Sequence, residues 1–132
     1  MSGPLTGEVQ IRVRYAETDR MGFLHHANHL VYFEQARTEL LRSQGLTYKD
    51  MEDRGFFLVI TSVDVKYRSP ARYDDLLTIK TTVTRTTPVR IEHTYEVSCG
   101  GRSVAIGKTT LACVDREGKI QALPEWFLEK RG

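Results

Sequence analysis

Residues 27–45, ANHLVYFEQARTELLRSQG, decide the fold, because they form the longest stretch of helical periodicity and contain no proline, and no glycine before Gly45. The side chains that recur at helical spacing are Leu30, Phe33, Arg37, Leu40 and Leu41. Glycine is the residue type that most often ends a helix. The stretch therefore predicts one helix of about 15 residues, which starts at Ala27 or Asn28 and stops at Gly45.

Strand periodicity flanks this helix on both sides. Residues 8–15, EVQIRVRY, alternate, and the residues expected on one face are Val9, Ile11, Val13 and Tyr15. Residues 56–68 alternate in the same way, and the expected face is Phe57, Val59, Thr61, Val63, Val65 and Tyr67. Before this second segment, Thr47 and Asp50 resemble a capping box, so a short helix is expected at residues 48–54.

Three more strands are expected, in residues 76–87, 90–98 and 103–114. Pro70 ends the strand before them, residues 115–119 form a turn, and Pro124 opens a C-terminal helix that reaches about residue 130.

The order of the elements predicts a single α+β domain over residues 1–132, with its core at about residues 8–116. In this domain an antiparallel sheet of about five strands packs against the long helix. One helix covers only one face of such a sheet, so the other face and at least one edge need a charged surface or a partner. An oligomer is therefore expected.

The composition is that of a globular domain with little net charge. The 19 basic and 17 acidic residues are interspersed and give a net charge of +2, so no nucleic-acid-binding surface is indicated. The sequence has no run of about 18 apolar residues and no secretion signal, so a cytoplasmic protein without membrane association is expected. Cys99 and Cys113 form no CxxC pair and are expected to be reduced thiols in the core.

The connector AETDRMGFLHH at residues 16–26 places acidic side chains just before the long helix. The first backbone N–H groups of a helix are unpaired and carry partial positive charge, so they can bind the oxyanion that forms when a carbonyl is attacked. Asp19, with Gly22 allowing the connector to turn, is placed to activate water or to attack the carbonyl directly. The alternative, that Glu17, Thr18 and Asp19 form only a capped surface turn, fits the pattern equally well.

The motif HHANH at residues 25–29 contains three of the four histidines. On a continuous helix His25 and His29 would share a face and could share a metal ion, as in HExxH proteins. The glutamate of that motif is missing, however, and His25 falls before the expected start of the helix. Further ligands would have to come from His93, carboxylates or the two separated cysteines. We therefore expect no metal and no other cofactor.

Taken together, residues 15–41, YAETDRMGFLHHANHLVYFEQARTELL, resemble the signature of the hot-dog-fold acyl-CoA thioesterases, in the branch that includes 4-hydroxybenzoyl-CoA thioesterase. The positions of the family pattern are filled by Tyr15, Asp19, Gly22, His26, Ala27 and Asn28. The later segment YRSPARYDD, residues 67–75, also resembles the family, and the likeness spans roughly residues 9–115. His25 and His29 depart from the pattern, because they stand where the family commonly has aromatic residues.

The resemblance implies a hot-dog fold, in which a curved antiparallel sheet wraps a long central helix and sheets join edge to edge in a homodimer or homotetramer. It also implies active sites between subunits that hydrolyse acyl-CoA to a free acid and coenzyme A. In that site Asp19 would be the general base or nucleophile, and the helix N-terminus at His26 would be the oxyanion site. The residues expected in or beside the acyl pocket are Tyr15, Gly22, His25, Asn28 and His29, of which Asn28 chiefly caps the helix and fixes the loop.

Coenzyme A carries phosphates, which basic side chains bind. Lys66, Arg68 and Arg72, around the YRSPAR segment, are the expected binding residues, and a solvated sheet face is the alternative. Glu34 is a rival catalytic carboxylate, since a second branch of the fold keeps its acid on the central helix, but an ion pair with Arg37 or a hydrogen bond to Thr38 is favoured.

Three other functions remain open on the same fold. The acyl group could be carried by acyl carrier protein instead of coenzyme A, because the same catalyst would serve both carriers. The chain could also be a non-catalytic acyl-CoA binding module that uses the same groove. A dehydratase is less favoured, because the sequence has no matching motif of a histidine plus an acid.

Overall fold

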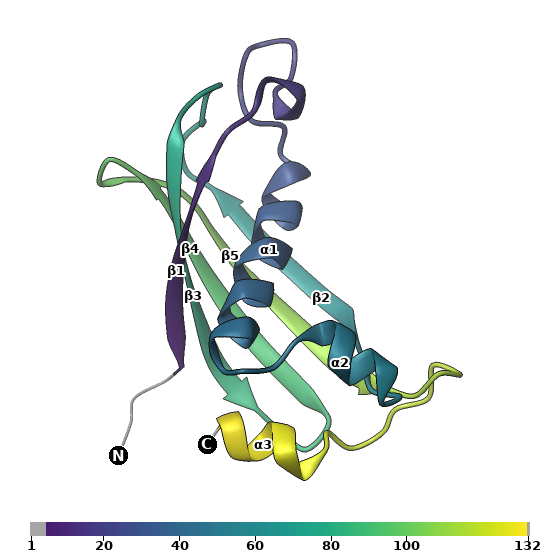
Figure 1. The fold of residues 1–132 in the computed structure, drawn as a ribbon. Coiled ribbons are helices and arrows are strands. Elements are labelled where there is room, and N and C mark those ends of the chain that lie inside the picture. The colour runs from purple at the N-terminus through teal and green to yellow at the C-terminus, as the bar shows by residue number, and fades with distance from the viewer. Residues whose placement is uncertain (1–4, 132) are drawn as a thin grey trace.

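Five antiparallel strands form one curved sheet that wraps around the helix α1 (Asn28–Ser43), as Figure 1 shows. The computed structural model of the chain describes residues 5–131, with side chains as far as residue 129. The strands are β1 (Thr6–Arg12), β2 (Phe57–Tyr67), β3 (Leu76–Thr86), β4 (Arg90–Cys99) and β5 (Arg102–Val114), and their order in the sheet is β1-β3-β4-β5-β2. The predicted α+β fold with one long helix and a five-stranded sheet is confirmed.

The helix α1 begins and ends where the sequence predicts. Its first residue is Asn28, and the chain turns away at Gly45, whose φ of 80° is readily adopted only by glycine. The side chains that it buries are His29, Tyr32, Phe33, Ala36, Arg37, Leu40 and Leu41. Leu30, which the pattern placed in this stripe, is 39% exposed. The buried stripe is therefore rotated by one residue at its start, so that His29 takes the place expected for Leu30.

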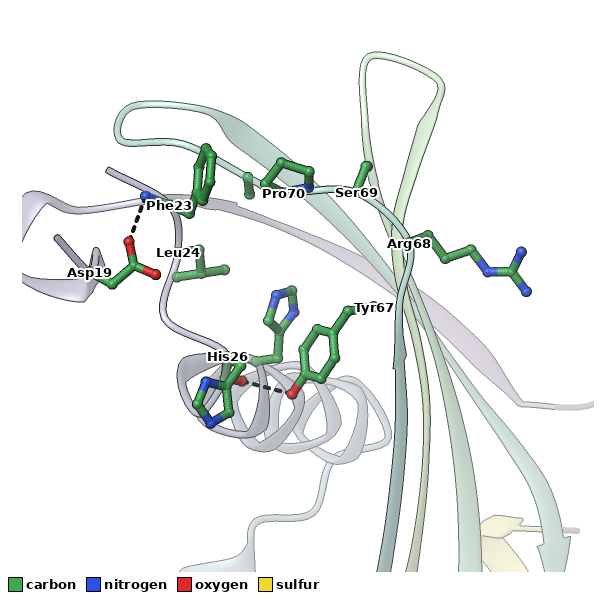
Figure 2. Close-up of a pocket in the computed structure, with 10 residues that line it drawn as sticks. Asp19, Phe23, Leu24, His26, Tyr67, Arg68, Ser69 and Pro70 are labelled. Atoms are coloured by element: carbon green, nitrogen blue, oxygen red, sulfur yellow. Dashed lines mark hydrogen bonds between the residues drawn. The ribbon is translucent and has the colours of Figure 1, made fainter. Parts of the chain in front are cut away.

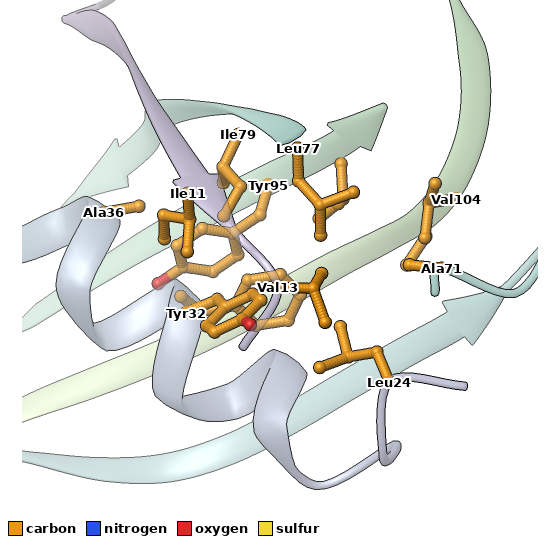
Figure 3. Packing of buried hydrophobic residues seen from close by; sticks show 13 residues of the cluster. Ile11, Val13, Leu24, Tyr32, Ala36, Ala71, Leu77, Ile79, Tyr95 and Val104 are labelled. Carbon is orange, nitrogen blue, oxygen red and sulfur yellow. The ribbon is translucent and has the colours of Figure 1, made fainter. Parts of the chain in front are cut away.

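Two apolar clusters fix α1 to the sheet along its whole length. The first lies under its N-terminal half and includes Phe33 together with residues that Figure 3 labels: Tyr32, Ala36, Ile11, Val13, Leu77, Ile79 and Tyr95. The second lies under its C-terminal half and includes Leu40, Leu41, Met51, Ile91, Cys113 and Phe127. Because both halves are anchored, the start of α1 has a fixed position relative to the ends of the strands.

The strand β2 contains a bulge that the sequence pattern does not show. Its pairing with β5 shifts by one residue between Ile60 and Ser62, which leaves Thr61 as the extra residue. Cross-strand partners share a face, and the partners of the α1-facing residues of β5 are Leu58, Ile60, Val63, Val65 and Tyr67. The expected face is thus correct after the bulge, but Phe57, Val59 and Thr61 were wrongly placed on it. A bulge reverses the alternation because strand side chains have a period of two.

The strand β1 is shorter than the predicted segment 8–15. It ends at Arg12, and the chain then forms the short 3-10 helix η1 (Tyr15–Glu17), in which the Glu17 N–H donates to the Arg14 carbonyl oxygen at 3.0 Å. Ile11 and Val13 are buried as expected, but Tyr15 is 77% exposed. The prediction that Tyr15 packs on the same face is therefore wrong, because η1 takes it out of the alternating pattern.

The remaining elements agree with the sequence. The short helix α2 (Tyr48–Asp53) is capped by the Thr47 hydroxyl oxygen, which accepts the Asp50 N–H at 3.0 Å, and α3 (Glu125–Arg131) follows Pro124. Cys99 and Cys113 are free thiols, and burial raises the pKa of Cys113. Within residues 5–131 no helix has both the length and the apolar character needed to span a bilayer.

Gly107 in β5 makes room for the helix. A methyl group on its Cα would lie 2.5 and 2.6 Å from two ring carbons of Phe33, whose ring is fully buried and stacked on Tyr95. Gly107→Ala is therefore expected to lower the free energy of unfolding by about 1–3 kcal/mol, because the ring or the helix must move. Urea denaturation measures this loss.

Gly7→Ala in β1 is the matched control. Its added methyl group would lie 3.0 Å from the flexible end of Leu40, and a smaller loss is expected. Equal losses in the two variants would contradict the close packing of Phe33 on Gly107.

Candidate active site

A cavity of about 340 Å³ lies between the start of α1 and the chain that follows β2. Its lining residues are Asp19, Phe23, Leu24, His26, His29, Tyr67, Arg68, Ser69, Pro70 and Ala71, most of them labelled in Figure 2. They come from only two stretches of chain, residues 19–29 and residues 67–71. These stretches are the connector before the long helix and the YRSPAR segment, which the sequence had singled out separately.

Asp19 is held in a tight turn at the cavity. Its Oδ1 accepts the backbone N–H groups of Met21 at 2.9 Å and Phe23 at 3.1 Å. The Gly22 N–H donates to the Asp19 carbonyl oxygen at 3.0 Å, and Gly22 has a φ of 80°. The second carboxylate oxygen, Oδ2, has no hydrogen bond to any residue in the described part of the chain. The turn that the sequence suggested is present, and it leaves one oxygen of Asp19 unengaged.

The same turn occurs a second time, after β5. Asp115 Oδ1 accepts the N–H groups of Glu117 at 2.8 Å and Lys119 at 3.0 Å, and Gly118 has a φ of 84°. The two sequences are DRMGF at residues 19–23 and DREGK at residues 115–119. The pattern Asp-Arg-x-Gly is thus sufficient for the turn. What distinguishes Asp19 from Asp115 is its position in the cavity wall beside the start of a long helix.

The entrance of α1 presents backbone groups to this region. The Tyr67 hydroxyl donates to the His26 carbonyl oxygen at 3.0 Å, which ties the entrance to the end of β2. Burial raises the pKa of Tyr67, so its hydroxyl stays protonated and can donate. The His26 N–H makes no hydrogen bond with any of residues 5–129. A cavity-lining residue at a helix start therefore has an unpaired backbone donor.

Asn28 has a different role from the cap that was expected. Ala27 occupies the N-cap position, and no side chain caps α1. The Asn28 side-chain amide instead donates to the Glu17 carbonyl oxygen at 3.0 Å. The prediction of a cap is wrong, whereas Asn28 does fix the loop as expected.

The two unusual histidines lie in different surroundings. His25 is exposed in the connector, and its ring stacks on His26 with 4.4 Å between centroids. His29 is 3% exposed, lines the cavity and packs against Tyr67 with 5.1 Å between centroids. Burial, together with the nearby His26, lowers the pKa of His29 to about 4. His29 is therefore a neutral imidazole at neutral pH.

No metal site is formed by the residues that the structure describes. Among them, no three side chains of histidine, cysteine, aspartate or glutamate come together. His25 precedes α1 whereas His29 lies within it, so the spacing of four residues is not that of one continuous helix.

Three other expected residues, Tyr15, Lys66 and Arg72, do not line the cavity, whereas Arg68 does. Tyr15 packs edge-on against Tyr73, with 5.7 Å between centroids. Lys66 is exposed on the face of β2 opposite to Tyr67. Arg68 lines the cavity, but Figure 2 shows its side chain directed away from His26 and Tyr67. The Arg72 guanidinium lies 4.7 Å from the centre of the Phe23 ring, at the rim of the cavity.

Glu34 is exposed and forms neither of the contacts expected for it. The Arg37 guanidinium is buried and donates instead to the Tyr95 hydroxyl, at 3.5 Å. Glu34 and Arg37 line a separate cavity of about 120 Å³, towards α2. The predicted ion pair is therefore wrong, and Glu34 does not line the cavity that contains Asp19. His93, which was named as a possible further metal ligand, is fully buried in the core.

Tyr67 and Glu17 are the residues that sequence reasoning missed at this site. The alternation placed Tyr67 on one face with Val63 and Val65, and the structure shows that this face is turned towards α1. Glu17 was considered only in the alternative of a capped surface turn, but it is 9% exposed and its carboxylate accepts a hydrogen bond from the Tyr32 hydroxyl.

A sequence model of the thioesterase-like superfamily matches residues 13–130. The chain belongs to this superfamily. The family predicted from residues 15–41 is therefore confirmed, and with it the prediction of a thioester hydrolase.

Named relatives of this thioesterase-like protein match most of its length. The acyl-CoA thioester hydrolase YbgC of Escherichia coli O6:H1 is 31% identical over 117 residues, which cover 87% of each protein. The structure of a DHNA-CoA thioesterase from Staphylococcus aureus is 31% identical with a TM-score of 0.89, covering 94% of this chain and 85% of that one. The structure of a hypothetical protein from Aquifex aeolicus is 32% identical with a TM-score of 0.91, covering 96% of this chain and 99% of that one.

The buried imidazole of His29 predicts a loss of stability in mild acid. Because the folded state lowers its pKa from 6.5 to about 4, the unfolded state takes up the proton first as the pH falls below 6.5. The free energy of unfolding is therefore expected to fall between pH 6.5 and pH 4, by about 2 kcal/mol at pH 5 from this group. In His29→Phe this part of the decrease should disappear, as measured by urea denaturation at pH 7.5 and pH 5.

His25→Phe, at the exposed neighbouring histidine, is the control and should keep the decrease of the unmodified protein. If His29→Phe lost as much stability between the two pH values as the unmodified protein does, the buried imidazole would not be the cause.

Proposed function

We propose that this protein hydrolyses an acyl-CoA thioester to a free acid and coenzyme A, with Asp19 as the catalytic carboxylate. The observation that carries the proposal is the meeting of Asp19 and His26 in the wall of one cavity, at the start of α1. Membership of the superfamily and the name of the YbgC relative support the same reaction.

In the proposed reaction the thioester carbonyl oxygen lies near the His26 N–H. The partial positive charge of the helix start and this unpaired donor would stabilise the oxyanion as it forms. Because the two N–H groups of the turn occupy Asp19 Oδ1, Oδ2 is the oxygen left for chemistry. The Tyr67 hydroxyl, bound to the His26 carbonyl oxygen, would hold the entrance of the helix during the reaction.

Asp19 has two possible routes to the same products. As a base, it accepts a proton from water while the water oxygen attacks the carbonyl carbon; the C–S bond then breaks and coenzyme A leaves as a thiolate, which takes up a proton. As a nucleophile, it displaces the thiolate to give a mixed anhydride, which water hydrolyses to the acid with recovery of the carboxylate.

The coenzyme A phosphates need basic side chains outside the cavity. Arg72, which lies over Phe23 at the rim, is the best placed of the three residues expected for this role. Arg102 is a further candidate, because it lies against two residues that line the cavity. Its Nη1 donates to the Ser69 hydroxyl oxygen at 2.7 Å and to the Pro70 carbonyl oxygen at 2.8 Å. Lys66 and Arg68 stay predictions, as does the cytoplasmic location.

The test of Asp19 uses the turn that occurs twice. Asn keeps the Oδ1 acceptor, so Asp19→Asn and Asp115→Asn should each retain their turn and change only the charge. Asp19→Asn is expected to lower kcat by about a thousandfold, measured as release of free thiol from a panel of short, long and aromatic acyl-CoAs. Asp115→Asn should leave turnover within about twofold. Unchanged turnover in Asp19→Asn would exclude this carboxylate from the reaction.

Acyl carrier protein is the alternative carrier, because the same cavity would serve either thioester. Comparing turnover of one acyl group on the two carriers separates the two enzymes. Binding of acyl-CoA without thiol release would instead indicate a non-catalytic acyl-CoA binding module.

We also propose that two copies pair through the free edge of β2. Apolar side chains along this edge strand, Val59, Ile60, Val63 and Tyr67, are 41% to 50% exposed, and Val31 on the adjacent α1 is 52% exposed. A long edge strand with exposed apolar side chains favours pairing with another chain. Because Tyr67 also lines the cavity, a partner at this edge would lie next to the active site. A homotetramer, as a pair of such dimers, stays a prediction.

Val63→Lys places a charge in the middle of this edge. It is expected to yield a monomer in light scattering after size-exclusion chromatography and to lose most of the thioesterase activity, because a buried charge without a partner opposes association. Gln10→Lys, on the opposite edge strand β1, should change neither. A Val63→Lys variant that remained a dimer would rule out β2 as the interface.

A further inference from the structure

We infer that Glu17 and Tyr32 form a buried positioning pair that holds Asp19 and His26 in place for thioester hydrolysis; this inference rests on the proposed function. Glu17 lies two residues before Asp19 and is 9% exposed. Tyr32 lies on α1 and is 1% exposed. Neither residue lines the cavity, so any effect on the reaction acts through the residues that they hold.

The Glu17 carboxylate is bound on both oxygens. Its Oε1 accepts the Tyr32 hydroxyl at 2.6 Å and the Arg14 N–H at 3.0 Å, and its Oε2 accepts the Arg14 guanidinium at 2.9 Å. The Arg14 side chain is largely exposed, so its ion pair is expected to contribute little. The bond to Tyr32 is short, buried and charge-assisted, so it is shielded from the solvent that screens the exposed ion pair.

The backbone of Glu17 holds the other side of the site. Its carbonyl oxygen accepts the His25 N–H at 2.9 Å and the Asn28 side-chain amide at 3.0 Å. One residue therefore binds the segment just before His26, the first turn of α1 through Asn28, and the next turn of the helix through Tyr32. Figure 3 shows Tyr32 among the core residues between the helix and the sheet.

The loop between Asp19 and His26 is closed at the same place. Thr18 and Leu24 form an isolated antiparallel bridge, and the bond from the His25 N–H to the Glu17 carbonyl oxygen lies beside it. Inside this base the chain makes the Asp19 turn, which is held by its own local hydrogen bonds. The turn fixes the shape of the loop, whereas Glu17 fixes the position of the loop relative to the helix.

The protonation states suit this arrangement. Burial alone would raise the pKa of Glu17, but the hydrogen bonds from Arg14 and Tyr32 outweigh it and the pKa is lowered. Burial and the adjacent carboxylate raise the pKa of Tyr32. At neutral pH the pair is thus a carboxylate and a protonated phenol, and it needs no proton exchange with the reaction.

A merely structural pair would be expected to affect stability alone, and Tyr95 provides the comparison. Its hydroxyl oxygen lies 2.6 Å from the Thr109 hydroxyl oxygen, and Tyr95 is fully buried in the same cluster as Tyr32. Tyr32→Phe and Tyr95→Phe therefore remove the same group and a hydrogen bond of the same length. Tyr95→Phe also removes the acceptor of the Arg37 guanidinium, but only the bond of Tyr32 leads to the catalytic loop.

We expect Tyr32→Phe to lower kcat by about tenfold or more, with KM changed by less than about twofold, because a shifted loop misplaces the reacting groups. Tyr95→Phe should keep kcat within about twofold, even if it loses as much unfolding free energy as Tyr32→Phe. Steady-state kinetics and urea denaturation of both variants measure this. A normal kcat in Tyr32→Phe, or an equal loss of kcat in Tyr95→Phe, would overturn the inference.

A second measurement keeps this inference separate from the proposed function. In ¹H–¹⁵N spectra, Tyr32→Phe should shift the backbone amide signals of Gly22, His25 and His26, and Tyr95→Phe should leave these three in place. If the unmodified protein released no thiol from any thioester, the proposed function would fail while this shift could still be observed. Unmoved signals in Tyr32→Phe would overturn the positioning pair whatever the reaction.

Discussion

The stacking of Phe33 on Tyr95, above the bare backbone of Gly107, is the contact on which the rest of the structure depends. The two rings lie 4.3 Å apart at their centroids, and Gly107 leaves the space that the Phe33 ring occupies. This contact lets α1 approach β5 closely enough for Tyr32 and Ala36 to join the same core. A helix held this firmly fixes its own first turn, and the cavity lies at that first turn.

The features that the sequence predicted correctly are those that depend on interactions between residues close together in the chain. The length of α1 and the Asp-Arg-x-Gly turns depend on residues within a few positions of one another. The bulge at Thr61 could not be predicted in this way, because apolar residues occupy both faces of the edge strand β2 and conceal the change of alternation. The burial of Glu17 was missed for a related reason, since its partner Tyr32 lies 15 positions further along the chain.

In the candidate site, too, the residues set by local sequence were predicted and those set by distant contacts were missed. Asp19 was proposed from the connector and His26 from the family resemblance, and the fold brings them to one cavity together with His29. Tyr67 was missed because its approach to His26 requires the end of β2 to lie beside the start of α1. The repeated turn at Asp115 shows that local geometry alone does not define a site. The same turn can contribute to a functional site only where the tertiary fold places a cavity next to it.

Tyr67 belongs both to the free edge of β2 and to the wall of the cavity. Under the proposed pairing, the completion of that wall and the meeting of two chains are a single event. A newly made chain would then be unable to act on thioesters until it found a second copy, and activity per chain would rise with protein concentration. Such a dependence would keep an isolated, incompletely assembled chain from hydrolysing thioesters in the cell.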